Sequence, residues 1–177
     1  GLPIKRALEV AGIPYTAVSK NSLLKHPVIK TVIDYLTIVV TLAGNKSGGE
    51  QAWWDLMYQL DFVEEDMVNI GRFMKENVKS ENITKKLYEN LDTLPLSSSG
   101  RLAARLLIER IKSILPEINS PITELLSVLY ARAGILPRQM NVETREIMLN
   151  LNKLLEIAAN HIEFYGSGAE NFLQYLA

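Results

Sequence analysis

The chain contains no cysteine, and only two of its 177 residues are histidines. The absence of cysteine excludes disulfide bonds, thiolate metal sites and cysteine nucleophiles. Because His26 and His161 are far apart in the sequence, histidine catalysis and a histidine zinc site are disfavoured. A chain without cysteine is compatible with a reducing compartment, so we expect a cytoplasmic protein.

Long hydrophobic runs are also missing. The longest uncharged apolar stretch, Leu36 to Leu42, is far shorter than the roughly 20 residues that a helix needs to cross a bilayer. The chain opens without a signal-peptide pattern. We therefore expect no membrane partner. With 47% hydrophobic and 22% charged residues, the composition is that of a globular protein large enough to fold without a metal or a disulfide.

No charge of one sign dominates, since 19 basic residues face 20 acidic ones. The charges nevertheless alternate in blocks. Residues 1–46 and 101–140 carry net positive charge, and residues 47–100 and 141–177 carry net negative charge. The positive blocks are suited to a polyanion, whereas a solvated helix surface is the alternative interpretation.

The hydrophobic pattern has the period of helices almost throughout. Residues 4–10 indicate a short helix, and residues 14–18, with their β-branched and aromatic side chains, are the only predicted strand. The predicted fold class is mainly α, with one short N-terminal strand left over from an α/β lobe. Pro27 at a first helical position is followed by an apolar band wide enough to predict a central helix.

Several helix boundaries are marked by their sequence. Capping boxes are predicted at Ser47–Glu50, Asp61–Glu64 and Ser167–Glu170. Ser80 or Asn82 is expected to start a helix that reaches Asn90, and Asn141 to start the longest helix, which ends near His161. In residues 101–115 the predicted apolar face holds Leu102, Leu106, Ile108, Ile111 and Leu115. Ser120 and Pro121 predict the next helix start, with Gly134 just beyond its end. The Pro- and Ser-rich segment at 92–100 predicts a hinge.

Motifs for catalysis are not found. Gly44-Asn45-Lys46-Ser47 matches only the end of a phosphate-binding loop and follows a helix, so a helix connection is the better interpretation. Glu64, Glu65 and Asp66 are expected as acids in a first helical turn, where the helix dipole favours them, and not as a metal site. Neither histidine lies near a serine elbow. Of Trp53 and Trp54, one is expected in the core and one partly exposed.

Several segments carry a family resemblance in their order and spacing. Ala11-Gly12-Ile13-Pro14-Tyr15 leads to Ser22–Lys30 and then to the apolar helix with Asp34, Tyr35 and Leu36. This arrangement resembles the UvrD/Rep/PcrA-type superfamily-one DNA helicases, with Lys30, Tyr35 and Leu36 matching the family motif. Later segments, Pro121 to Leu126, Gly134 to Leu136 and Asn171 to Leu176, are similar to helices of the family's 2B subdomain and of the stretch that follows it.

The resemblance implies a division of the chain. Residues 1–26 would be a remnant of the second RecA-like motor lobe, a helix, turn and strand, and residues 27–177 would be a helical 2B-like accessory subdomain. The chain begins without methionine and ends without a polar tail, so we expect a segment of a longer protein. The ATPase motifs would lie outside it. ATP and Mg²⁺ are therefore expected as cofactors of the full-length enzyme, which would act in DNA repair, and no cofactor is expected here.

The resulting functional hypothesis is a non-catalytic accessory region of an ATP-dependent DNA helicase, which contacts DNA or partner proteins and regulates unwinding. The expected partners are DNA, bound weakly and without sequence preference, the remaining motor domains, and a second copy of the chain. The candidate phosphate contacts are Lys25, His26, Lys30, Lys85, Lys86, Arg101 and Arg105. Solvated surface charge is the alternative interpretation for each. The rival hypothesis is a free-standing helical protein-protein interaction module.

Overall fold

The computed structural model describes residues 19–77, 79 and 82–177, and this part of the chain is mainly helical. The predicted helix at 4–10, the strand at 14–18 and most of the motor-lobe remnant lie outside the described residues. The helices are α2 (Lys20–Leu24), α3 (Pro27–Ala43), α4 (Glu50–Tyr58), α5 (Glu64–Asn77), α6 (Ile83–Asn90), α7 (Ser98–Ile114), α8 (Ile122–Arg132), α9 (Val142–Tyr165) and α10 (Ala169–Leu176), with short 3₁₀ helices η1 (Leu91–Thr93) and η2 (Leu115–Glu117).

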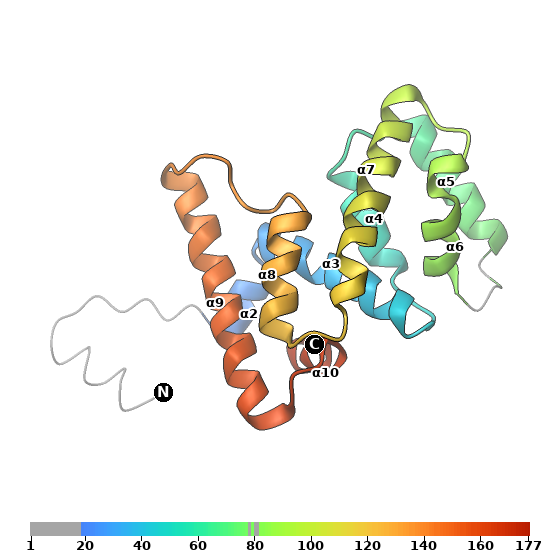
Figure 1. Ribbon diagram of the computed structural model, residues 1–177. Coiled ribbons are helices and arrows are strands. Elements are labelled where there is room, and N and C mark those ends of the chain that lie inside the picture. The colour runs from blue at the N-terminus through green and yellow to red at the C-terminus, as the bar shows by residue number, and fades with distance from the viewer. Residues whose placement is uncertain (1–18, 78, 80–81) are drawn as a thin grey trace, which may run out of the picture.

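Helix α3 is the centre of the molecule, as its wide apolar band predicts. It lies between a group formed by α2, α8, α9 and α10 and a group formed by α4 to α7 (Figure 1). Pro27 occupies the first helical turn as expected, and the His26 Nδ1 atom accepts a hydrogen bond from the Val28 amide at 3.3 Å. Residues on several sides of α3 are fully buried, among them Ile29 and Leu36, so both groups share one hydrophobic core.

Three predicted helix boundaries are confirmed. Asn82 caps α6 by accepting from the Lys85 amide, and Asn141 caps α9, the longest helix, in a capping box with Thr144. Gly134 follows the end of α8 with a φ of 67°, the left-handed conformation that favours glycine. Helix α9 ends at Tyr165, beyond the predicted His161.

The three predicted serine and aspartate capping boxes are wrong. Gly49 and Gly168, not Ser47 and Ser167, are the N-cap residues of α4 and α10, and neither cap has a side-chain hydrogen bond. The Gly48 carbonyl, just before α4, accepts from the Thr84 hydroxyl. Asp61 does not cap α5 either, because α5 begins at Glu64 and its N-cap position is Val63.

The predicted apolar face of α7 is also partly wrong. Leu102 and Leu106 are exposed, whereas the buried face includes Ala103, Ala104 and Leu107. Two of the buried positions of α7 are thus taken by alanines, which a pattern of large apolar residues does not indicate, and the two larger leucines face solvent. Ser97 caps the helix, so α7 begins at Ser98, three residues before the predicted start, and only Ser97 of the serine run lies outside it.

Asp66 of α5 ties α5 to the start of α7. Its carboxylate accepts from the Val63 amide at 3.1 Å, from the Ser97 amide at 2.6 Å and from the Ser97 hydroxyl at 2.7 Å. Asp66 is 1% exposed. Burial disfavours the charged carboxylate, but the hydrogen bonds from Ser97 and Val63 outweigh this effect and lower the pKa of Asp66. The acid that was expected only to favour the helix dipole thus joins two helices.

Within the predicted segment at 92–100, the helical pattern breaks only at residues 94–97, between η1 and α7, and several side chains hold the backbone there. Arg101 donates to the Asp92 and Leu94 carbonyls, and Asn69 donates to the Pro95 carbonyl at 2.8 Å. Whether the segment acts as a hinge stays a prediction. The expectation for the tryptophan pair is confirmed, because Trp53 is fully buried and Trp54 is half-buried.

Candidate functional site

The first group of predicted phosphate contacts lies where α2 meets α3. Lys25 is exposed, and His26 lies with its Nε2 atom 3.8 Å from Glu146. Lys30 lies between two carboxylates, with its Nζ 3.5 Å from Asp34 Oδ2 and in direct contact with Asp55. The hydrogen bond to Asp55 is the main reason that the pKa of Lys30 is raised. Two acids therefore already neutralise the Lys30 ammonium.

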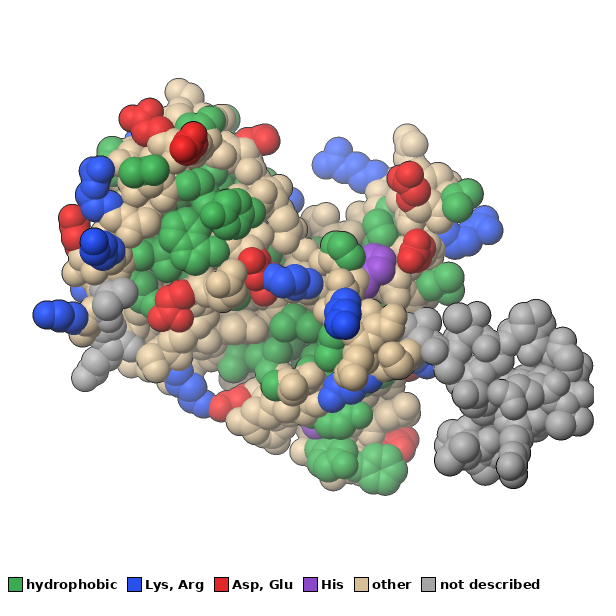
Figure 2. Space-filling view, turned by 180° about the vertical axis from the view of Figure 1, so that it is seen from behind, with side chains coloured by type: hydrophobic (Ala, Val, Ile, Leu, Met, Phe, Trp, Pro, Cys, Tyr) green, Lys and Arg blue, Asp and Glu red, His purple; other side chains and the backbone are tan. Residues whose placement is uncertain are grey.

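The second group lies on α6 and α7. Lys85 pairs with Glu89 one turn along α6, and Lys86 donates to the Asn77 side chain. Arg101 is directed toward backbone carbonyls, while Arg105 is exposed on α7. Among the predicted phosphate contacts, Lys25 and Arg105 are thus the cations that no described carboxylate or carbonyl holds. Figure 2 shows basic and acidic side chains interspersed on one face of the molecule.

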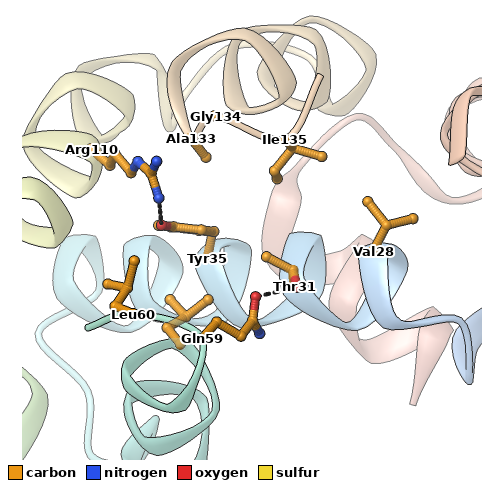
Figure 3. A pocket seen from close by; sticks show the side chains of 10 residues that line it. Val28, Thr31, Tyr35, Gln59, Leu60, Arg110, Ala133, Gly134 and Ile135 are labelled. Carbon is orange, nitrogen blue, oxygen red and sulfur yellow. Dashed lines mark hydrogen bonds between the residues drawn. The ribbon is translucent and has the colours of Figure 1, made fainter. Parts of the chain in front are cut away.

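A cleft that sequence reasoning missed lies between the two helix groups (Figure 3). We call it the Tyr35–Arg110 cleft; its volume is about 200 Å³. It is lined by Val28, Thr31, Tyr35, Leu56, Gln59, Leu60, Arg110, Ala133, Gly134 and Ile135. The walls come from α3, the end of α4, α7 and the turn after α8, so segments far apart in the sequence form one site.

The polar groups of the cleft come from two pairs of side chains. Arg110 Nη1 donates to the Tyr35 hydroxyl oxygen at 3.3 Å. Across the cleft, the Thr31 hydroxyl lies 2.9 Å from Gln59 Oε1, and Gln59 Nε2 donates to the Asp55 carbonyl at 3.2 Å. The Gln59 amide is therefore engaged at both ends. The remaining donors are the hydrogen of the Tyr35 hydroxyl, the other N–H groups of Arg110 and the second N–H of Gln59 Nε2.

The guanidinium of Arg110 is held close to the backbone of the turn after α8. A Cβ atom built on Gly134 would lie 2.6 Å from Arg110 Nη2, so a larger residue there would displace the end of the Arg110 side chain, and the positive φ itself favours glycine. No carboxylate in the described part of the chain forms an ion pair with Arg110. Tyr35 is 2% exposed; burial raises the pKa of its hydroxyl, although Arg110 opposes the shift.

An acidic pair lies between α3 and α4, with Asp34 on α3 and Asp55 on α4. Asp34 is 7% exposed, and Lys30 Nζ lies 3.5 Å from its Oδ2 atom, too far for a strong hydrogen bond. Burial raises the pKa of Asp34 to about 6, the negative charge of Asp55 adds to the increase, and Lys30 counteracts it. Asp55 differs, since the hydrogen bond from Lys30 lowers its pKa. The two carboxylates therefore share one ammonium group unequally.

A buried histidine lies at the other end of the molecule. His161 of α9 is 3% exposed, and neither ring nitrogen has a hydrogen-bond partner. Its ring centroid lies 5.2 Å from that of Tyr165, 5.4 Å from that of Phe172 and 4.9 Å from that of Tyr175. Burial lowers the pKa of His161, so a neutral ring is favoured. The histidine packs as an aromatic core residue.

Two sequence signals point to the cleft only in retrospect. Gly134 was predicted as a left-handed residue after a helix, and Tyr35 as a family-matched position, but nothing in the sequence links either one to Arg110. The contacts join α3 to α7 and to the turn after α8, and such long-range pairs leave no local pattern.

Comparison of the chain with protein-family models, with curated proteins and with solved structures gives no match. Residues 19–77, 79 and 82–177 contain no group of three or more His, Cys, Asp or Glu side chains placed to hold a metal ion. In the same part of the chain, no helix has both the length and the apolar character needed to cross a membrane.

Proposed function

We propose that this chain is a non-catalytic, 2B-like accessory region of an ATP-dependent DNA helicase. The observation that carries the proposal is the ordered set of family-like segments, from Gly12-Ile13-Pro14-Tyr15 through Lys30, Tyr35 and Leu36 to residues 171–176. The mainly helical fold supports it, because an arm that transmits force between a motor and DNA requires rigid elements. In this proposal the chain contributes contacts and regulation, and the motor supplies ATP hydrolysis.

The positions of Tyr35 and Leu36 give the proposal a structural rationale. Both residues match the family motif, and both are buried in α3, the helix against which most of the other helices pack. In the proposed accessory region, this part of the family motif would therefore serve to maintain the hydrophobic core. Lys30, the third matched residue, holds α3 to α4 through Asp55. The matched residues thus support the architecture of the region, while DNA contact falls to Lys25 and Arg105.

We expect weak, salt-dependent binding of the chain to duplex DNA. If about two phosphates are neutralised, the logarithm of the binding constant should fall with the logarithm of salt concentration with a slope of about −2. Fluorescence anisotropy with a labelled duplex at two salt concentrations measures this slope. A double variant, Lys25→Gln with Arg105→Gln, should reduce the slope toward zero.

Lys153→Gln is the matched control, since Lys153 lies on α9 in an acidic block and pairs with Glu156. It should leave the slope unchanged. Absence of binding at low salt would contradict the DNA-contact role, as would equal slopes for the double variant and the wild type.

A helical protein-protein interaction module is the second candidate function. The observation that favours it is the set of exposed apolar side chains over the α4 to α7 group, where Tyr58 is 73% exposed and Leu102 is 67% exposed. Figure 2 shows apolar side chains gathered on this group of helices. Exposed apolar clusters of this kind are typical of protein-binding surfaces. DNA binding with the slope above would favour the helicase proposal over this one.

A further inference from the structure

The Tyr35–Arg110 cleft has the features of a small-molecule or side-chain binding site. It combines a cavity of about 200 Å³ with one cation, one hydroxyl donor and apolar walls. The charge of Arg110 has no carboxylate partner among the described residues, although the side chain is half-buried. A half-buried guanidinium without a counter-charge is partly desolvated without compensation, and an anion that enters the cleft removes this penalty.

The donors of the cleft are free to bind such an anion. Because the Tyr35 oxygen accepts from Arg110 Nη1, the hydroxyl hydrogen points elsewhere, and no described residue accepts it. The hydroxyl and the unused edge of the guanidinium can then donate to the two oxygens of one planar group. Gln59 is held in place by its bonds to Thr31 and to the Asp55 carbonyl, and the second N–H of its Nε2 atom is a further, neutral donor.

The charge and the walls of the cleft select among anions. A single guanidinium balances one negative charge, whereas a phosphate monoester near neutral pH carries between one and two. The apolar part of the wall consists of Val28, Leu56, Leu60, Ala133 and Ile135, which are suited to a hydrocarbon stem. We propose that the Tyr35–Arg110 cleft binds a carboxylate carried on a short aliphatic stem, the group that a glutamate side chain presents.

This inference is independent of the helicase proposal, because it uses neither the predicted phosphate contacts nor the family resemblance. It assigns a role to Gly134 as well. The absence of a Cβ atom there lets the guanidinium lie against the turn, with Nη1 directed at Tyr35. The turn after α8 therefore positions the cation of the site.

Nuclear magnetic resonance titration with butyrate tests the proposal. The backbone amides of Gly134 and Ile135, which line the cleft, should shift in a saturable way. We expect a dissociation constant on the order of millimolar, because a ligand with so few heavy atoms gains little binding free energy. Butyramide, which has the same shape without the charge, should cause no saturable shift. Inorganic phosphate should bind more weakly than butyrate.

Two variants and one control locate the site. Arg110→Gln should weaken butyrate binding about tenfold or more, because a charge-assisted hydrogen bond is lost. Tyr35→Phe keeps the buried ring and should weaken binding about fivefold through loss of the hydroxyl donor. Lys112→Gln, which changes an exposed lysine on the same helix, should leave butyrate binding unchanged. Circular dichroism establishes that each variant is folded.

A titration with a short peptide distinguishes the possible sources of the carboxylate. Binding of acetyl-Ala-Glu-Ala-amide, with no binding of its Gln counterpart, would support a protein side chain, and binding of butyrate alone would support a small free acid. The proposal is overturned if butyrate gives no saturable shift at any concentration that the protein tolerates. It is also overturned if Arg110→Gln binds butyrate as well as the wild type, or if phosphate binds more tightly than butyrate. None of these outcomes would bear on the proposed DNA contacts of Lys25 and Arg105.

Discussion

The Gly100→Ala variant is expected to lose about 3 to 5 kcal/mol of unfolding free energy, the combined effect of an overpacked site and a disrupted buried carboxylate. A Cβ atom on Gly100 would lie 2.1 Å from Asp66 Oδ2 and 2.5 Å from its Cγ. The Asp66 carboxylate cannot move away without losing its hydrogen bonds to Ser97 and Val63, and it is buried. Urea unfolding followed by tryptophan fluorescence measures the loss.

Helix propensity alone would predict the opposite effect for Gly100→Ala. Gly100 lies within α7, and alanine is favoured over glycine in a helix by about 1 kcal/mol. Gly71→Ala is the matched control, because Gly71 lies within α5 and its Cβ would meet only Trp54, at an ordinary distance of 3.6 Å. We expect Gly71→Ala to be neutral or stabilising by up to about 1 kcal/mol.

A double-mutant cycle separates the clash from other effects at Gly100. Asp66→Ala is itself expected to be destabilising, since it leaves the Ser97 amide without its acceptor. In that background the clash is gone, so Gly100→Ala should no longer destabilise. If Gly100→Ala costs the same free energy with and without Asp66, the contact between these two residues does not determine the stability of the α5 to α7 junction.

Replacing Asp34 with asparagine should stabilise the protein by about 2 to 3 kcal/mol at pH 8. The carboxyl has a pKa of about 6 in the folded chain, above its ordinary value of 3.8, chiefly because it is buried. Above pH 6 the folded state therefore carries a charge that the unfolded state solvates better. Asparagine keeps the shape of the side chain without this charge.

The pH dependence of the unfolding free energy separately tests whether the Asp34 charge is destabilising. As pH falls through 6, the folded chain takes up a proton at Asp34 before the unfolded chain does, so this residue's contribution to wild-type stability rises until the pH nears 3.8. The advantage of Asp34→Asn should accordingly shrink between pH 7 and pH 4. Urea unfolding of the wild type and of Asp34→Asn at several pH values measures the difference in unfolding free energy.

Asp55→Asn is the control for the acidic pair. Its pKa is lowered by the hydrogen bond from Lys30, so the ionised form of Asp55 stabilises the fold. Since Asp55 is partly exposed to solvent, we expect Asp55→Asn to cost no more than about 1 kcal/mol at pH 8. Loss of stability in Asp34→Asn at pH 8 would mean that the Lys30 contact outweighs the burial of Asp34.

The sequence predicted the helices better than their contacts. The central helix from Pro27 and the starts at Asn82 and Asn141 are confirmed, because a proline, an asparagine cap and an apolar period are local signals. The capping boxes at Ser47 and Ser167 are wrong, because glycines take the N-cap positions there. The capping-box spacing does not show that a helix starts one or two residues later, at a glycine.

The contacts of the candidate site residues were harder to predict than the helices, because their partners are far away in the sequence. Lys30 was predicted as a phosphate contact from its charge and its position, but Asp55, 25 residues later, lies against it. Asp66 was predicted only as a first-turn acid, and its partner Ser97 follows 31 residues later. Arg110 and Tyr35 are 75 residues apart, so no motif could have indicated their cleft.

Sequencing the gene on both sides of the segment that encodes these 177 residues tests the central claim most directly. The helicase proposal predicts one continuous reading frame, with a Gly-Lys-Thr or Gly-Lys-Ser loop encoded upstream and a further motor motif shortly downstream. A reading frame that starts next to Gly1 and contains neither motif would contradict it.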